Sequence, residues 1–155
     1  MILLKKIIKV VKIFIITLIF SLNFFVSSYA NQSVEEIIKG RKAMFSENYQ
    51  NAKKISILLK SKKIEEAKPL MQKISNNYKK LLNYFPENTK EGFKTEALPT
   101  IWENSDEFVT LMQKASYDML QLAKAIDTAD DLRAAQKELM WSNCSACHNR
   151  FRAEH

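Results

Sequence analysis

The stretch SDEFVTLMQKASYDMLQLAKAI, from Ser105 to Ile126, indicates the fold most directly. Its apolar residues recur every three or four positions, so they lie on one face of an α-helix. They are Phe108, Leu111, Met112, Ala115, Met119, Leu122 and Ile126. Most of the positions between them hold polar or charged residues. The stretch therefore predicts an amphipathic helix whose apolar face packs against other helices.

Two further helices are predicted before this one. The first runs from about 33 to 59 and starts with Ser33 and Glu36 at capping-box spacing. The second runs from about 64 to 84, and Pro69 either lies in its first turn or kinks it. The apolar positions on the first helix are Val34, Ile38, Phe45, Ala52, Ile55 and Leu59, and those on the second are Leu70, Met71, Ile74, Tyr78, Leu81 and Leu82.

A fourth helix is predicted to follow, with a capping-box-like start at Thr128 and Asp131 and an end near Phe151. The longest connection, residues 85–103, separates the second helix from the third. The chain holds only two Gly and three Pro, which argues against a turn-rich β architecture. Short links within each helix pair predict an all-α, antiparallel, up-down-up-down four-helix bundle. The turn-forming residues of the long connection are Pro86, Gly92 and Pro99.

Residues 1–30 are predicted to be a secretory signal peptide. A basic opening precedes an uncharged apolar run of 14 residues from Ile13 to Val26, and Ser28 and Ala30 are the small residues that favour cleavage after Ala30. The run is short for a membrane span of roughly 20 residues, so cleavage is favoured over an uncleaved anchor. The expected mature domain, residues 31–155, is then exported to the periplasm.

The net charge of +7 is partly a property of this leader, which holds four lysines and no acid. Without these lysines, 20 basic and 17 acidic residues remain. No basic cluster interleaved with aromatic residues is present, so no nucleic-acid partner is expected. A mildly positive surface favours docking to an acidic partner protein.

The chemistry of the chain is predicted by Cys144-Ser145-Ala146-Cys147-His148, a C-x-x-C-H motif. This motif attaches c-type haem: the two thiols bond the two vinyl groups, and the adjacent imidazole ligates the iron. These are the only two cysteines in the chain. The motif therefore predicts one covalently attached haem c per chain, with His148 as the axial iron ligand.

Three other interpretations of the two cysteines compete with haem attachment. A disulfide would close a very small loop and stabilise little. A thioredoxin-like redox pair normally follows a strand in a βαβ setting, whereas this pair lies near the end of the last predicted helix. A zinc site needs more ligands, and the only other histidine is His155 at the terminus. Haem attachment is favoured over all three.

Over residues 33–152 the sequence resembles the class II c-type cytochromes, the group of cytochrome c′ and cytochrome c-556. The attachment motif lies near the C-terminus, as in that group, and is followed by Phe151 and Arg152. Pro99-Thr100-Ile101-Trp102 matches a Pro-x-Ile-Trp element before the third helix. Arg41 takes the place of a first-helix arginine that meets the haem propionates. The resemblance implies a haem at one end of a four-helix bundle, and a homodimer.

Arg41 also stands out without the resemblance, because a charge on an apolar stripe needs a partner. A propionate contact is favoured over an arginine that extends to solvent from the edge of the stripe. Trp102 either closes one end of the bundle or contacts the porphyrin. Arg152, one helical turn beyond His148, either influences the axial imidazole or is solvated.

The resemblance makes the residue four after Arg41 decisive for the sixth iron position. Methionine there implies a six-coordinate electron carrier, and an apolar or aromatic residue implies a five-coordinate iron that binds small gases. Here that residue is Phe45, with Met44 beside it. Phe45 lies near the centre of the apolar stripe and has no ligating atom. An open iron under Phe45 is favoured over ligation by the Met44 thioether after a modest helix rotation.

Two functions follow from this interpretation. The first is electron transfer in the periplasm to a redox partner protein, and the alternative is binding of nitric oxide or carbon monoxide. An enzyme is not expected, because a haem peroxidase would want a distal histidine or arginine and the two histidines are axial and terminal. A bundle without haem that uses the cysteines as a disulfide is the remaining alternative.

Overall fold

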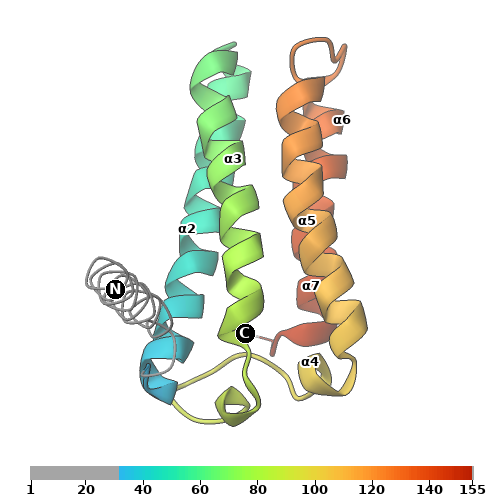
Figure 1. The fold of residues 1–155 in the computed structure, drawn as a ribbon. Coiled ribbons are helices and arrows are strands. Elements are labelled where there is room, and N and C mark those ends of the chain that lie inside the picture. The colour runs from blue at the N-terminus through green and yellow to red at the C-terminus, as the bar shows by residue number, and fades with distance from the viewer. Residues whose placement is uncertain (1–31, 155) are drawn as a thin grey trace, which may run out of the picture. The chain divides into compact units, whose positions relative to one another are not determined.

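The computed structural model describes residues 32–154, which form a bundle of helices (Figure 1). Its helices are α2 (Val34–Lys60), α3 (Ile64–Leu81), α5 (Ser105–Ala125) and a segmented fourth helix made of α6 (Leu132–Gln136), the π-helical turn η3 (Lys137–Trp141) and α7 (Ser142–Phe151). Figure 1 shows them alternating in direction along the chain. The predicted all-α four-helix class is confirmed. The predicted signal peptide lies outside the described residues. Within residues 32–154, no helix has both the length and the apolar character to cross a membrane.

The long connection passes under one end of the bundle. Because α3 ends at Leu81 rather than near residue 84, the connection spans residues 82–104 in the structure. It contains the short helices η1 (Leu82–Tyr84), η2 (Glu87–Thr89) and α4 (Thr100–Glu103). The end of α7 pairs with it, because Leu98 N donates to Phe151 O at 3.0 Å and Ala153 N donates to Glu96 O at 2.9 Å. The C-terminus and the connection therefore close this end of the bundle together.

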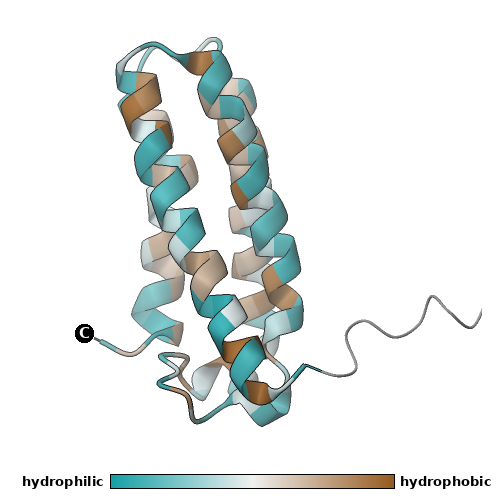
Figure 2. Ribbon diagram, turned by 90° about the vertical axis from the view of Figure 1, so that its left-hand side faces the viewer, coloured by the Kyte–Doolittle hydropathy of each residue, from teal (hydrophilic) through white to brown (hydrophobic). Residues whose placement is uncertain are grey.

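The buried apolar residues form two clusters along the bundle. The cluster at the α2–α3 turn contains Ala52, Ile55, Leu58, Leu59, Ala67, Met71, Ile74, Met119, Leu122, Ile126 and Met140. The cluster near the long connection contains Leu81, Ile101, Phe108, Met112 and Phe151. Figure 2 shows hydrophilic and hydrophobic bands recurring along each helix, as amphipathic helices require. The predicted apolar stripes supply most of both clusters.

The fourth helix differs from the prediction in two ways. It begins at Leu132 rather than near Thr128, because the Asp131 carboxylate caps it by accepting from the backbone N–H groups of Arg133 at 2.9 Å and Ala134 at 3.0 Å. It is also interrupted by the π-helical turn η3, which precedes the cysteine motif. A π-helical turn contains more residues than an α-helical turn. It therefore changes the direction in which all later side chains of the helix point.

Candidate functional site

A cavity of about 580 Å³ lies between the two core clusters. Helix α2 packs mainly against α3, η1 and η2, and its side facing the fourth helix lines this cavity instead. The volume is within the roughly 300–1,000 Å³ that is typical of cofactor and ligand sites. Its walls are mainly apolar and come from all four long helices. The lining residues that α3 and α5 contribute are Ile74, Tyr78, Phe108, Leu111, Met112, Ala115 and Met119.

Cys144, Cys147 and His148 all lie on the wall of this cavity. Both thiols are free and partly buried, and Cys144 Sγ donates to Met140 O at 3.7 Å. Burial raises the pKa of the Cys147 thiol to about 11 and also raises the pKa of Cys144. Both thiols are therefore protonated at neutral pH, whereas redox-active C-x-x-C pairs have a lowered thiol pKa. The thioredoxin-like interpretation loses support.

Among residues 32–154, His, Cys, Asp and Glu side chains do not gather in any group of three or more that could hold a metal ion. A structural zinc site needs four such ligands.

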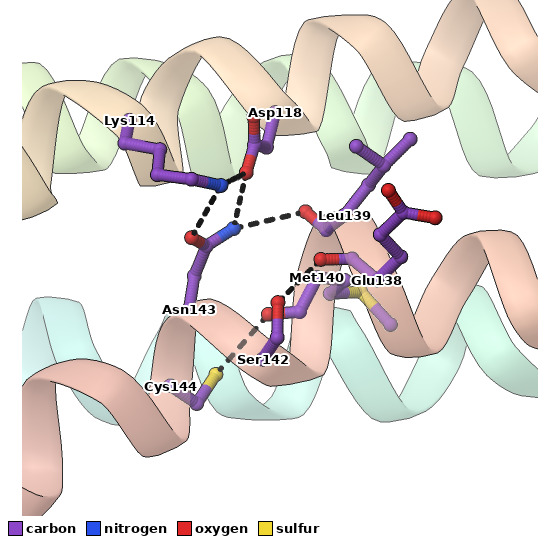
Figure 3. Close-up of polar contacts among 8 residues, drawn as sticks. All are labelled: Lys114, Asp118, Glu138, Leu139, Met140, Ser142, Asn143 and Cys144. Atoms are coloured by element: carbon purple, nitrogen blue, oxygen red, sulfur yellow. Dashed lines mark hydrogen bonds and ion pairs between the residues drawn. The ribbon is translucent and has the colours of Figure 1, made fainter.

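Side-chain hydrogen bonds stabilise the π-helical turn before the motif (Figure 3). Ser142 donates to Glu138 O, Asn143 Nδ2 donates to Leu139 O at 3.1 Å, and Cys144 Sγ contacts Met140 O. Each of these side chains bonds back to the carbonyl four residues before it. Each extra residue turns a helix by about 100°, so this turn decides which side of α7 faces the cavity.

A buried polar cluster joins the first turn of α7 to α5 (Figure 3). Asn143 Nδ2 donates to Asp118 Oδ2 at 2.9 Å, and Lys114 forms an ion pair with the same carboxylate oxygen. Asp118 is only 6% exposed and Asn143 only 8%. Since Asn143 directly precedes Cys144, this contact helps to hold the motif in place.

Replacing Asp118 with alanine is expected to lower the free energy of unfolding by about 1–3 kcal/mol, because a buried amide loses its charged acceptor. Urea denaturation monitored by circular dichroism measures this. Lys114→Ala is the matched control, since the lysine side chain is 55% exposed and its removal leaves the Asp118–Asn143 bond intact. An equal loss in both variants would show that the ion pair, not the buried bond, stabilises this region.

Arg41 lines the cavity but directs its guanidinium at the long connection. Nη1 donates to Tyr84 O at 3.2 Å and Thr89 Oγ1 at 3.0 Å, and Nη2 donates to Thr89 O at 3.0 Å and to Thr95 Oγ1. Burial lowers the pKa of Arg41 to about 10, so it stays charged at neutral pH. The four Nη–H donors are used within the protein, which leaves only Nε–H. The contact with a haem propionate stays a prediction.

The other residues singled out in the sequence lie in different surroundings. Phe45 lines the cavity and meets the Phe85 ring edge-on, with centroids 6.5 Å apart. Met44 packs on the cluster near the long connection and is not among the lining residues. Trp102 is not among them either, and its indole N–H donates to Phe85 O at 2.9 Å. Arg152 is at the cavity wall, with Nε donating to Glu96 Oε2 at 2.9 Å.

Two further residues of the cavity wall, Tyr78 and Asn48, were not predicted as site residues from the sequence. Tyr78 is next to the Cys144 thiol, and burial raises the pKa of its phenol. Asn48 is 5% exposed, and its Nδ2 has no hydrogen-bond partner among residues 32–154. The sequence did contain an indication for Asn48, because this residue, like Arg41, is a polar residue on an otherwise apolar helix stripe.

These residues fit the predicted haem. The cavity has the size and apolar character that a porphyrin needs, and two thiols and an imidazole share one wall.

Comparisons with known proteins agree with this fit. The family model described as Cytochrome C' matches residues 36–152. A cytochrome c' from Rhodopseudomonas palustris is 32% identical over 124 residues, which cover 77% of this chain and 83% of the relative.

Solved structures show the same fold. Cytochrome c' from Thermochromatium tepidum superposes with a TM-score of 0.69 at 25% identity, covering 81% of this chain and all of the other. A ferrous variant of cytochrome c prime from Alcaligenes xylosoxidans with bound NO gives a TM-score of 0.68 at 20% identity, covering 83% of this chain and all of that one. At that identity the second likeness extends to the fold alone.

Proposed function

This chain belongs to the cytochrome c′ family of non-enzymatic haem proteins, and on that basis we propose that it carries one haem c, attached through Cys144 and Cys147 and ligated by His148. The observation that supports this assignment is that all three side chains line one apolar cavity of adequate size. The test is the mass of the polypeptide made with intact haem-attachment machinery. A mass without haem would refute the assignment.

The function supported best is electron transfer in the periplasm to a partner protein. When bound, the haem supplies a one-electron redox centre. The protein contributes apolar walls that exclude water, an imidazole as iron ligand, and the basic residues Lys42 and Arg152 where the cavity meets the long connection. Reversible one-electron reduction in a spectroelectrochemical cell tests this role, and an iron that cannot be cycled would contradict it.

Binding of nitric oxide or carbon monoxide is the second candidate. It is supported by Phe45, which lines the cavity and has no ligating atom, and by the NO-bound relative of the same fold. Broad high-spin bands that shift with carbon monoxide are expected for the reduced protein. Sharp low-spin bands that ignore carbon monoxide would instead indicate a sixth protein ligand, and Met44→Ala would show whether Met44 supplies it.

Replacing Phe45 with methionine is expected to abolish carbon monoxide binding. A flexible thioether at this position can ligate the iron and produce a low-spin, six-coordinate centre with a higher reduction potential. Absorption spectra with and without carbon monoxide measure this. Phe45→Leu is the matched control and should still bind the gas. If both variants bind it equally, Phe45 does not cover the open iron position.

The proposal also includes export through a cleaved signal peptide and formation of a homodimer. Cleavage after Ala30 would give a mature chain that begins at Asn31, which N-terminal sequencing of periplasmic protein tests. Homodimer formation is tested by light scattering on the haem-loaded protein, and a monomeric mass at micromolar concentration would exclude a stable dimer.

A further inference from the structure

The cavity opens to solvent between α2 and the fourth helix. Residues that both line the cavity and are exposed mark this opening, and they are Lys42, Ser46 and Tyr49 on α2 and His148 on α7. Helix α2 packs mainly against α3, η1 and η2, so the fourth helix does not cover this side of α2. A haem ligated by His148 is therefore reached most directly from solvent at this opening.

Two aromatic rings border the opening from opposite sides. Tyr49 on α2 and Trp141 on η3 meet edge-on, with ring centroids 6.4 Å apart, and both line the cavity. Tyr49 is nevertheless 54% exposed. Among the exposed large hydrophobic residues within 32–154, Tyr49 alone belongs to the cavity wall. Because exposed tyrosine and tryptophan often anchor protein–protein contacts, this pair indicates a docking surface.

Lysines extend this surface at the end away from the long connection. Lys53 Nζ lies 5.4 Å from the centroid of the Tyr49 ring. Since α2 and the fourth helix run in opposite directions (Figure 1), the positions one turn after Tyr49 and about one turn before Trp141 lie at the same end of the aromatic pair. Lys53 and Lys137 occupy these positions, and both are exposed. Two positive charges therefore flank the aromatic pair at this end.

The charges at the other end of the opening are also mainly positive. Lys42 and Arg152 line the cavity there, and both pair with Glu96, with N–O distances of 3.9 Å for Lys42 and 2.9 Å for Arg152. Another acid, Glu138, is exposed on η3 three residues before Trp141. The four cations at the two ends of the opening outnumber these two acids, so the opening attracts an acidic partner.

We propose that this opening, with Tyr49 and Trp141 at its centre and four cations around them, is the docking surface for an acidic redox protein. The inference rests on the proposed electron transfer and adds where the partner binds and which charge it carries. One electron passes between the haem and a one-electron cofactor of the partner, and no bond forms or breaks. Opposite charges raise the association rate of such a pair, and the exposed aromatic ring adds apolar contact to a small, transient interface.

The test measures by stopped flow how fast oxidants of opposite charge accept an electron from the reduced, haem-loaded protein. The acidic copper protein plastocyanin is the partner probe, and tris(phenanthroline)cobalt(III) is a small cationic probe. Lys53→Glu together with Lys137→Glu is expected to slow oxidation by plastocyanin about tenfold at low ionic strength and to accelerate oxidation by the cobalt complex. The loss should shrink as added salt screens the charges.

Lys79→Glu together with Lys124→Glu is the matched control, because it changes the net charge equally on another side of the bundle. Lys79 and Tyr117 line a smaller cavity between α3 and α5, and Lys124 lies on the same face of α5 as Tyr117. Both lysines are exposed. This control should slow plastocyanin by less than about twofold. An equal slowing in both double variants would show that net charge alone decides the rate, and the proposal would fail.

Tyr49→Ser tests the aromatic part of the surface. It is expected to slow oxidation by plastocyanin about fivefold at every salt concentration, which corresponds to ~1 kcal/mol of lost contact, and to leave the rate of the small cobalt complex unchanged. Tyr117→Ser is the control, since Tyr117 is 60% exposed on the other side of the bundle and should affect neither rate. The reduction potential of each variant is measured to establish that the driving force is the same.

Other outcomes separate this inference from the proposed function. Plastocyanin rates that stay unchanged in the Lys53→Glu/Lys137→Glu and Tyr49→Ser variants, with haem that is still reversibly reduced, would overturn the inference and leave the function in place. A homodimer that dissociates on Lys53→Glu/Lys137→Glu in light scattering would assign the opening to a contact between two copies and overturn the inference as well. A wild-type iron that cannot be cycled would refute the proposed function itself.

Discussion

A variant with both Cys144→Ala and Cys147→Ala is expected to contain no covalently attached haem. Each thioether needs one of the two sulfurs, and no other cysteine exists in the chain. Both side chains line the cavity, so their removal deletes the attachment without changing the rest of the wall. The mass of the intact polypeptide and its haem absorption after denaturation measure this directly.

Ser145→Ala is the matched control for this variant. Ser145 lies between the two cysteines on α7 and is exposed. Its hydroxyl makes only a 3.4 Å contact with Trp141 O. This variant should retain a full complement of haem. Haem that survives denaturation of the double cysteine variant would contradict thioether attachment at this motif.

Replacing Arg41 with methionine is expected to lower the free energy of unfolding by roughly 3 kcal/mol. The change removes a buried guanidinium that donates to Tyr84, Thr89 and Thr95, and it leaves buried acceptors of the long connection unpaired. Since domains of this size are stable by only about 5–15 kcal/mol, the loss is a large share of the total. Chemical denaturation of the haem-loaded protein measures it.

Lys42→Met provides the comparison for Arg41. Lys42 is the adjacent residue and also donates to the connection, to Lys94 O at 2.9 Å, but this bond is exposed. Its loss should change stability by no more than about 0.5 kcal/mol. If Arg41→Met leaves stability unchanged but shifts the reduction potential, the guanidinium serves the haem propionates and does not anchor the connection.

The fold class could be predicted from the sequence because helical periodicity is a local property. The apolar stripe from Phe108 to Ile126 is almost wholly buried in α5, and the start of α3 at Ile64 agrees with the prediction. The attachment motif was equally readable, since its three reactive side chains lie within five consecutive residues. Features that depend on short spacing along one helix need no knowledge of the partner helices.

The π-helical turn before the motif was not predictable. Nothing in the residues of η3 distinguishes them from an ordinary helix, and the α7 residue Asn143, two positions after the turn, bonds to Asp118 on α5, a contact that only the fold creates. The hydrogen-bond partners of Arg41 were not predictable either. Its position on an apolar stripe indicated that a partner must exist, but the structure supplies one from the long connection, some fifty residues later in the chain.

The sequence by itself determined the helical class, the family and the three residues of the attachment motif, because these follow from periodicity and spacing within single segments. Only the tertiary structure decided which side chains of α2 and α7 line a common cavity, and that Arg41 donates to the long connection. Those relations depend on the rotation of each helix about its axis, which is established when side chains far apart in the chain pack and pair their buried polar groups.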